Sequence, residues 1–478
     1  MNRPVLEMKK TKSIFILICA SCILARTGVA LPSVTVHIDT KARGAAIPDD
    51  FAGLSFEMQY VLPATNGTYF FSPKNRTLVK MFRTLGIRNL RMGGNTADRP
   101  GVPIPGPADA DSLFAFARAA DVKVIYTLRL RQGNAEDVLP IAKYIEQHYR
   151  AQLACFAIGN EPDVFTKQYP VYRDEWKKYV AAITAVAPEA TFCGPCATPT
   201  RVAWSGEFAD DFAKSGLIKY ITQHDYPGGD SRHATNVVAA RDQMLSPDWL
   251  DHYEKFYNAF ATTALSNGLP YRYDEANSFY DGGARDVSDT FASALWGLDF
   301  LHWWAAHDCA GINFHTGDKV AARDMNKPCR YAVFWTSNKG YSVHPIGYAI
   351  KAFELGGHGR TLPLNFSDTN FLDLTAYAVY GDSKTLLVTI INKEHGVDGR
   401  SVNVMIKAAG IKGRGRVIFL SSPDGDVAAK TGVTLGSASI RDDGSWNGKW
   451  NRLSSDTKNE CEVTVPAASA AVVKLPLK

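Results

Sequence analysis

Two glutamates at the ends of strand-like segments are the residues in this sequence best suited to chemistry. Glu161 follows the apolar run Leu153–Ile158 after two residues, and Glu275 directly follows residues 271–274. The proline after Glu161 has a fixed φ and no N–H, so the chain turns immediately beyond that carboxylate. For one such glutamate, a strand end closed by a turn is the simpler interpretation. Two of them favour glycoside hydrolysis, which needs a protonated carboxyl group to donate to the leaving oxygen and an ionised one to attack carbon.

The elements that would position these carboxylates alternate between short apolar strands and longer helices. Eight such alternations span residues 51–355. They fit an α/β fold of the (β/α)8 TIM barrel type better than an open doubly wound sheet. No Gly-x-Gly-x-x-Gly motif follows the first strand, which argues against a dinucleotide-binding fold. The strands are predicted at residues 51–60, 87–92, 122–130, 153–158, 191–194, 220–224, 271–274 and 311–314, and the helices at residues 73–85, 108–120, 136–149, 172–186, 206–215, 247–267, 287–307 and 345–355. The helix at 287–307 is expected to be the longest.

A different pattern begins after residue 360. Alternating segments separated by Gly, Asn, Asp and Ser turns predict an antiparallel β-sandwich, with strands at residues 374–379, 385–391, 401–406, 416–420 and 462–465. Residues 33–39 also alternate and are expected to join it. The predicted organisation is a signal peptide at 1–30, a strand contributed to the β-sandwich within 31–48, the catalytic barrel at 49–358 and the C-terminal β-sandwich at 359–478.

The first thirty residues have the pattern of a secretory signal peptide, with basic residues before an apolar run and a small-x-small ending. About twelve apolar residues are too few to span a bilayer, so we expect a secreted or periplasmic protein without a membrane anchor. Removing this segment leaves 48 basic and 47 acidic residues and lowers the formal charge from +5 to +1. This charge argues against a polycationic surface for nucleic acid or long sulfated chains, and leaves a local basic patch as the alternative.

Six cysteines remain outside that segment, too scattered for a disulfide scaffold. Cys193 and Cys196 have the spacing of a redox or zinc half-site, but the sequence has no second Cys or His pair that would complete a zinc site. Buried thiols or a single disulfide are the remaining interpretations. Cys309 and Cys329 flank one loop and are the preferred pair.

Polar residues just after the predicted barrel strands define one surface, because the active site of such a barrel lies at the C-terminal ends of its strands. The residues of this surface are Glu57, Arg91, Asn95, Arg129, Arg131, Asn160, Glu161, His224, Tyr226, Glu275, Asn277 and His315. Arg91 has two equal interpretations, an ion-pair partner for a neighbouring glutamate and a substrate contact. Arg129 and Arg131 are interpreted mainly as solvated rim charges. The histidines can equally be satisfied core residues, and they lack the paired spacing typical of metal ligation.

Several motifs resemble one family of glycosidases. Ile-Gly-Asn-Glu-Pro at residues 158–162 and the glutamate of the seventh strand are similar to the catalytic motifs of clan A glycoside hydrolases. The wider pattern, from about residue 33 to the end, resembles glycoside hydrolase family 79, which contains β-glucuronidases and heparanases. It depends on the segments Gly-Leu-Ser-Phe-Glu at 53–57, Arg-Met-Gly-Gly-Asn at 91–95, His-Asp-Tyr at 224–226 and Tyr-Asp-Gly-Gly at 280–283.

The resemblance implies a retaining mechanism with Glu161 as acid/base and Glu275 as nucleophile. It also implies that Asn160 holds the sugar 2-hydroxyl. Physical chemistry is consistent with this division, because an ionised Glu275 raises the pKa of Glu161, while a hydrogen bond from Tyr226 keeps Glu275 ionised. Once Glu275 is esterified the repulsion disappears, and Glu161 can act as a base toward water.

Family members hold the uronate carboxylate with backbone N–H groups after the nucleophile and with tyrosine hydroxyls. By resemblance, Tyr280, Gly282 and Tyr331 would do so here. The sequence departs from the family at Asp281, where some members have glycine, and an aspartate beside a bound carboxylate must point away from it. The other substrate-binding residues implied are Glu57, Asn95, Asn160, His224 and His315.

The sequence therefore predicts an exported retaining exo-β-glucuronidase that acts on a β-glucuronide or a glucuronate-containing glycan and needs no metal or cofactor. Exo action is favoured over heparanase-like endo cleavage because of the nearly neutral charge. Another clan A specificity, such as xyloside or arabinoside hydrolysis, and a catalytically silent carbohydrate-binding barrel remain as alternatives.

Overall fold

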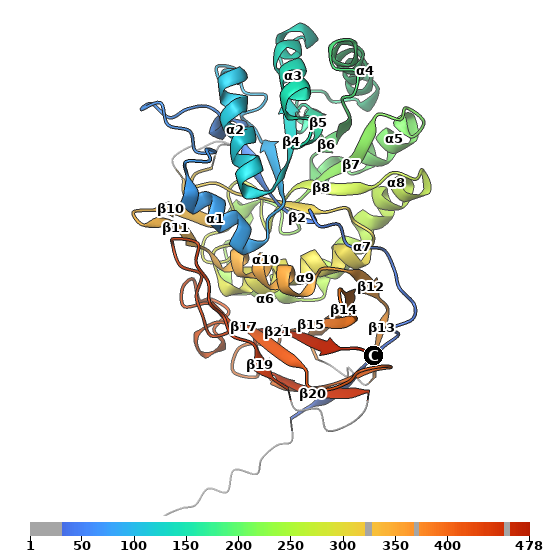
Figure 1. Ribbon diagram of the computed structural model, residues 1–478, viewed down its shortest axis with the longest axis vertical. Helices are drawn as coiled ribbons and strands as arrows, with labels where there is room; N and C mark the ends of the chain where they lie inside the picture. The colour runs from blue at the N-terminus through green and yellow to red at the C-terminus, as the bar shows by residue number, and fades with distance from the viewer. Residues whose placement is uncertain (1–30, 321–326, 368–371, 454–458) are drawn as a thin grey trace, which may run out of the picture. The chain divides into compact units, whose positions relative to one another are not determined.

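Eight parallel strands close into a barrel in the computed structural model, which describes residues 31–320, 327–367, 372–453 and 459–478 (Figure 1). The barrel strands are β2 (Ala52–Glu57), β3 (Asn89–Gly93), β4 (Lys123–Leu128), β5 (Leu153–Ile158), β6 (Phe192–Ala197), β7 (Ile218–Asp225), β8 (Tyr271–Ala276) and β9 (Ile312–His315). Each pairs with the next, and β9 pairs with β2 to close the ring. The (β/α)8 fold class is confirmed. The predicted signal segment at 1–30 lies outside the described residues.

Helices follow the barrel strands and cover their outer side (Figure 1). They are α1 (Arg76–Leu85), α2 (Pro107–Ala120), α3 (Ala135–Tyr149), α4 (Tyr169–Val186), α5 (Ala203–Phe212), α6 (Val237–Leu245), α7 (Asp248–Phe256), α8 (Thr262–Ser266), α9 (Phe291–Ala306) and α10 (Pro345–Gly356). Among the described residues α4 is the longest helix, with 18 residues, so the prediction for residues 287–307 was wrong. Turns precede Thr290, which caps α9 in an extended conformation, and α9 has only 16 residues.

Local capping also sets the start of α1. The side chain of Asn75 accepts a hydrogen bond from the backbone N–H of Leu78 at 3.3 Å, so the helix begins at Arg76 and not at the predicted residue 73. Gly86 follows it with φ 78°, so the helix ends at Leu85, which is the end of the predicted range 73–85. The predicted helix at 247–267 is α7 and α8 joined by a π-helical segment, Tyr257–Ala261.

The remaining strands form two further sheets and a hairpin. Their bounds are β1 (Ser33–Ile38), β10 (Phe334–Ser337), β11 (Gly340–Val343), β12 (Arg360–Leu362), β13 (Leu364–Ser367), β14 (Leu374–Gly381), β15 (Thr385–Asn392), β16 (Val402–Ala408), β17 (Arg416–Ser421), β18 (Thr434–Leu435), β19 (Asn451–Arg452), β20 (Glu460–Val465) and β21 (Ser469–Pro476). One sheet has the order β13-β1-β16-β20, and the other has the order β12-β14-β15-β21-β17-β18 with β19 beside β17. The sandwich is not wholly antiparallel, because β1 pairs parallel with β16. β10 and β11 form the hairpin.

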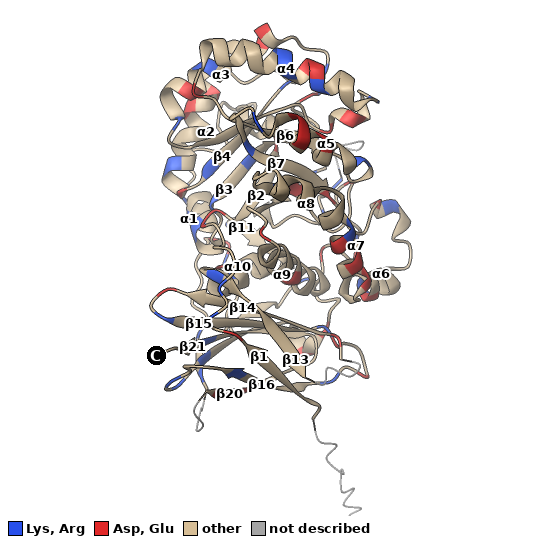
Figure 2. Cartoon of the chain, turned by 90° about the vertical axis from the view of Figure 1, so that its right-hand side faces the viewer, with Lys and Arg blue, Asp and Glu red and all other residues tan. Residues whose placement is uncertain are grey.

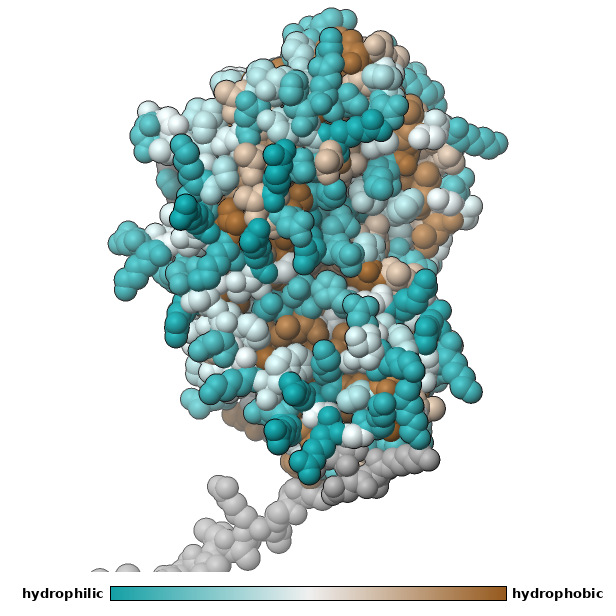
Figure 3. All heavy atoms as spheres, viewed as in Figure 1, coloured by the Kyte–Doolittle hydropathy of each residue, from teal (hydrophilic) through white to brown (hydrophobic). Residues whose placement is uncertain are grey.

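Large aromatic side chains fill the layer between the barrel strands and their helices. Trp176 on α4, and Trp296 and Trp304 on α9, are each at most 1% exposed. On the face shown in Figure 3, hydrophobic residues lie in small separate areas among hydrophilic ones. Within the described part of the chain, every helix is too short or too polar to cross a bilayer.

The expected disulfide between Cys309 and Cys329 is wrong, because both thiols are free and buried. Cys309 precedes β9, and its Sγ lies 3.3 Å from the carbonyl oxygen of Gly311. Cys329 lies beyond the other end of the same strand, where its N–H donates to the carbonyl of Asp318. A strand extends by about 3.3 Å per residue, whereas a disulfide needs Cα atoms within about 7 Å. Strand β9 therefore keeps the two thiols apart.

A buried ion pair ties α9 of the barrel to the sandwich. Asp299, on α9, accepts hydrogen bonds from the hydroxyl groups of Thr375 and Tyr377, each at 2.7 Å. Its other oxygen lies 3.3 Å from Nζ of Lys393, and the two charged side chains are 5% and 3% exposed. A buried charge is costly unless it is paired, so Asp299 depends on Lys393, which also lies 3.4 Å from Oδ1 of Asp373.

Replacing Lys393 with methionine is expected to lower the free energy of unfolding by about 3–5 kcal/mol, because Asp299 would remain as a buried charge without its cation. Thermal unfolding followed by circular dichroism measures this loss as a lower Tm. Adding Asp299→Asn to Lys393→Met removes the orphaned charge and is expected to recover part of the loss. An unchanged Tm in the single variant would contradict this role of the pair.

Candidate active site

Glu161 lies just beyond the C-terminal end of β5, where the chain turns sharply. Gly159 has φ 80° and Glu161 has φ 47°, so both are left-handed. For a residue with a side chain this conformation costs about 1–3 kcal/mol and persists only where the surroundings hold it. Here the N–H of Glu161 donates to the carbonyl of Cys196 at 3.0 Å, and Pro162 begins a 3-10 turn. The Glu161 carboxylate is thereby placed 3.0 Å from His224.

Glu275 lies near the end of β8, next to a second buried carboxylate, Asp274. The pairing of β8 shifts register against both of its neighbours, β7 and β9. Such irregularities break the strict alternation of side chains along a strand. Two consecutive acidic residues can therefore both contact Arg91 inside the barrel.

The guanidinium of Arg91 is fully buried and joins the parts of the site. Its Nη1 lies 2.5 Å from Oε2 of Glu275 and 3.1 Å from Oγ of Ser55. Its Nε lies 3.4 Å from Oδ2 of Asp274, and its Nη2 donates to Oδ1 of Asn160 at 2.7 Å. Of the two interpretations of Arg91, the ion-pair partner is the one that the structure shows.

Tyr226 and His315 contact the Glu275 carboxylate from other sides. The Tyr226 hydroxyl donates to Oε1 at 2.7 Å, and Nδ1 of His315 lies 3.6 Å from Oε2. Burial alone would raise the pKa of Glu275, but the nearby imidazoles, the guanidinium and the Tyr226 hydrogen bond outweigh it and lower that pKa. Glu275 is therefore ionised at neutral pH.

His224 lies between the two glutamates. Its Nδ1 is 3.0 Å from Oε1 of Glu161 and 3.8 Å from Oε1 of Glu275, and its Nε2 is 3.7 Å from Oδ1 of Asp274. Burial lowers the pKa of His224, but the charges of Glu275 and Asp274 raise it well above its usual value. The imidazole thus lies among three carboxyl groups, whose charges favour its protonated form.

Glu161 is in a different electrostatic environment from Glu275. Its side chain is 19% exposed, whereas that of Glu275 is 8% exposed. Burial raises the pKa of Glu161, the hydrogen bond and charge of His224 lower it, and the charge of Glu275 raises it, with a net increase. The two carboxyl groups therefore hold different protonation states over one range of pH.

One oxygen of Glu161, one of Glu275 and one nitrogen of His224 lie within 4.8 Å of one another. These donor types are also those of a metal site. A metal ion would compete with the guanidinium of Arg91, which lies 2.5 Å from Glu275. The cluster is better described as an acid pair arranged around Arg91 and His224.

Glu57, at the end of β2, holds the loop that follows β3. Its carboxylate accepts hydrogen bonds from the N–H of Asn95 at 3.2 Å and from both the N–H and the hydroxyl of Thr96 at 2.7 Å. One oxygen also lies 3.6 Å from Nε2 of His315. Glu57 is 3% exposed, while the side chain of Asn95 is exposed at the rim.

Asp98 positions Asn160, although it was not among the predicted site residues. Its carboxylate accepts hydrogen bonds from the N–H groups of Asn160, Leu130 and Arg131 at 2.7, 2.6 and 2.9 Å.

Asp274 was also missed as a site residue. The position of Asp274 at the end of the predicted seventh strand was the available signal for it, whereas Asp98 lies five residues beyond β3 and no strand-end pattern indicates it.

The predicted carboxylate-binding residues lie on two segments joined by backbone hydrogen bonds. The carbonyl of Gly282, which has φ 86°, accepts from the N–H of Arg330 at 2.6 Å and of Tyr331 at 3.4 Å. The rings of Tyr280 and Tyr331 have their centroids 6.3 and 6.1 Å from that of Tyr226. The structure thus brings Tyr280, Gly282 and Tyr331 together beside the tyrosine that contacts the predicted nucleophile.

Asp281, the departure from the family pattern, lies next to Ser231, whose hydroxyl is 3.5 Å from the Asp281 carbonyl oxygen. It has a left-handed backbone with φ 61°. The pKa of Arg232 is raised first by its hydrogen bonds and ion pair with Asp230, and in part by the charge of Asp281.

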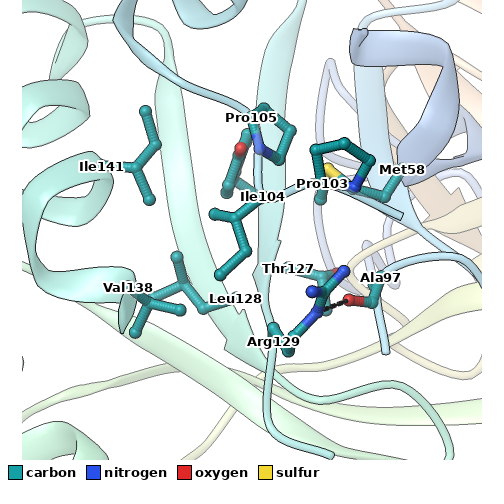
Figure 4. A pocket seen from close by; sticks show the side chains of 11 residues that line it. Met58, Ala97, Pro103, Ile104, Pro105, Thr127, Leu128, Arg129, Val138 and Ile141 are labelled. Atoms are coloured by element: carbon teal, nitrogen blue, oxygen red, sulfur yellow. Dashed lines mark hydrogen bonds between the residues drawn. The ribbon is translucent and has the colours of Figure 1, made fainter. Parts of the chain in front are cut away.

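The side chains of Arg129 and Arg131 contact neighbouring loop residues. The guanidinium of Arg129 donates to the carbonyls of Ala97 and Val102 at 3.0 and 2.5 Å, so it holds a loop and is not simply a solvated rim charge. Figure 4 shows this side chain in the wall of a small apolar cavity of about 10 Å³, enough for one water at most. The guanidinium of Arg131 lies over the ring of Phe165, 5.5 Å from its centroid.

Comparison with known sequences identifies related proteins for parts of the chain. Residues 376–472 match the glycosyl hydrolase family 79 C-terminal beta domain. A β-glucuronidase of Aspergillus niger is 25% identical over 255 residues, which are 46% of this chain and 45% of that protein. The similarity thus spans about half the length of that relative.

Solved structures resemble the chain over nearly all of its length. A 4-O-α-L-rhamnosyl-β-D-glucuronidase from Fusarium oxysporum 12S has a TM-score of 0.70 at 18% identity, covering 92% of this chain and 99% of its own. The GH51 arabinofuranosidase from Xanthomonas axonopodis pv. citri has a TM-score of 0.67 at 14% identity, covering 93% and 99%. At such identities these likenesses show the shared fold. Together with the matched C-terminal domain and the related β-glucuronidase, they support the resemblance of the chain to glycoside hydrolase family 79, in clan A.

Proposed function

We propose that the protein is a retaining exo-β-glucuronidase that hydrolyses β-D-glucuronides by double displacement. One observation carries the proposal: oxygens of Glu161 and Glu275 lie within 4.8 Å of each other, and the pKa of the first is raised while that of the second is lowered. Retaining glycosidases hold their carboxyl groups about 5–5.5 Å apart, whereas inverting ones leave about 6.5–9.5 Å for a water. The short separation supports retention.

In the first step, ionised Glu275 attacks the anomeric carbon while Glu161 donates its proton to the leaving oxygen. The glycosidic C–O bond breaks and a glycosyl ester forms on Glu275. Esterification removes the negative charge of Glu275, which lowers the pKa of Glu161. In the second step, Glu161 takes a proton from water, whose oxygen attacks the anomeric carbon and releases Glu275.

A glucuronide is proposed as substrate because uncharged hydrogen-bond donors gather beside Glu275. Tyr280, Tyr331 and the backbone around Gly282 would bind the uronate carboxylate. Asn160, whose side chain is fixed by Arg91, would bind the 2-hydroxyl. The names of two similar proteins, a β-glucuronidase and a rhamnosyl-glucuronidase, support this substrate class.

Exo action on small or terminal glucuronides is proposed over endo cleavage of a sulfated polymer. Without residues 1–30 the formal charge is +1, and Figure 2 shows Lys and Arg interspersed with Asp and Glu. An open cavity of about 430 Å³ between β2 and α1 is lined by uncharged residues, among them Tyr60, Tyr69 and Phe70. A neutral surround favours uncharged neighbours of the glucuronate. The pattern of residues 1–30 supports export as a secreted or periplasmic protein.

A 2-fluorinated β-glucuronide with a good leaving group is expected to inactivate the enzyme and leave a mass adduct on the peptide that contains Glu275. Glu275→Gln should take up no label. Glu161→Gln should still be labelled, because a good leaving group needs no proton, yet it should lose about 10²–10⁴-fold in kcat/KM on substrates with poor leaving groups. Peptide mass spectrometry and steady-state kinetics measure both effects.

An active enzyme labelled elsewhere would overturn the assignment of Glu275. If a panel of aryl glycosides, including glucuronides, xylosides and arabinosides, is left intact by the wild-type protein, the catalytically silent carbohydrate-binding alternative would replace the proposal. Preferential turnover of xylosides or arabinosides would instead support another clan A specificity.

In His224→Asn, both limbs of the pH profile of kcat/KM are expected to move to higher pH. His224 lowers the pKa of Glu161. Without His224, Glu161 keeps its proton to higher pH, so the alkaline limb of the profile moves to higher pH. His224 also lowers the pKa of Glu275. Without His224 that pKa increases, so the acid limb of the profile also moves to higher pH. The profile of kcat/KM on an aryl glucuronide reports these groups in the free enzyme. His148→Asn, at an exposed histidine on α3, is the control, and limbs that stay in place would contradict this role of His224.

A further inference from the structure

A loop of the β-sandwich, between β17 and β18, contacts the chain that follows β8. The carbonyls of Ala429 and Val427 accept hydrogen bonds from the N–H groups of Phe291 and Ala292 at 2.8 and 2.9 Å. These are the first residues of α9, whose N–H groups have no partner within the helix. The sandwich therefore caps the helix that comes directly after the segment carrying Tyr280 and Gly282.

Lys430 of the same loop makes two ion pairs with that segment. Its Nζ contacts Asp286 and lies 3.2 Å from Oδ2 of Asp289. The Asp289 side chain is 5% exposed, and its Oδ1 is buried with no hydrogen-bond partner among the residues described. A buried carboxylate depends on nearby cations, whereas an exposed ion pair contributes little. Of the two ion pairs of Lys430, the one with the buried Asp289 is therefore expected to contribute more to stability than the exposed one with Asp286.

Asp289 links Lys430 to the predicted uronate pocket. Its Oδ2 also lies 3.5 Å from Nη1 of Arg330, the residue before Tyr331. The N–H groups of Arg330 and Tyr331 both approach the carbonyl of Gly282. The contacts thus run without interruption from the sandwich loop to the two segments that would bind the substrate carboxylate.

We propose that Lys430 is a positioning residue, supplied by the β-sandwich, that fixes Arg330 and Tyr331 against Gly282 for binding the uronate. It acts through Asp289 and touches no substrate. This inference depends on the proposed glucuronidase function. It makes the sandwich part of the specificity site and not only a support for the barrel.

Lys430→Met, which removes the charge and keeps an apolar stem, is expected to raise KM for an aryl β-glucuronide by about threefold to thirtyfold, with kcat changed by less than about threefold. The inhibition constant of free glucuronate should rise with KM. Lys430→Arg keeps the charge and should recover most of the loss. Lys412→Met, at an exposed lysine of the same sandwich, is the matched control and should behave as wild type.

Hydrogen exchange provides a readout that needs no substrate. Backbone amides of residues 282–289 are expected to exchange faster in Lys430→Met than in Lys412→Met. Unchanged exchange, wild-type kinetics, or a lower kcat with unchanged KM would each overturn the inference. Failure of the proposed function is distinguishable, because the wild-type protein itself would then leave aryl β-glucuronides intact.

Discussion

A buried guanidinium beneath two carboxylates is the interaction on which the candidate site depends. Burial lowers the pKa of Arg91, but the charges of Asp274 and Glu275 raise it above the usual value, so the group stays charged. Burial likewise raises the pKa of Asp274, but Arg91 and His224 lower it overall. Without the central cation, adjacent buried carboxylates would repel each other and take up a proton. Since Arg91 also fixes Asn160, one residue sets both the charge and the geometry of the site.

The fold delivers this cluster through local irregularities in a regular barrel. Strict alternation along β8 would send Asp274 and Glu275 to opposite faces, and its register shifts bring both to Arg91. At the end of β5 a left-handed residue aims the Glu161 carboxylate at His224. The regular strands supply rigidity, and the irregular positions orient the carboxyl groups of the candidate site.

Much of this arrangement could be predicted from the sequence because it depends on local patterns. The barrel follows from apolar strands alternating with helices, and Glu161 and Glu275 follow from being polar residues at strand ends. The features that were missed depend on tertiary contacts. Strand β21, at the centre of the larger sheet, has a Ser-Ala-Ala-Val-Val run that is buried on both faces, so it shows no alternation. Asp98 reaches Asn160 from a loop, which no spacing rule indicates.

The left-handed backbone of Glu161 sets folding stability against the proposed catalytic role of its side chain. Glycine tolerates this conformation without a penalty and asparagine with a smaller one, so glutamate is among the less favourable residues for position 161. A chain released from selection for activity would gain stability by losing this side chain. Position 161 is therefore where we expect an inactive descendant of this enzyme to diverge early, and where design for thermal stability alone would choose the wrong residue.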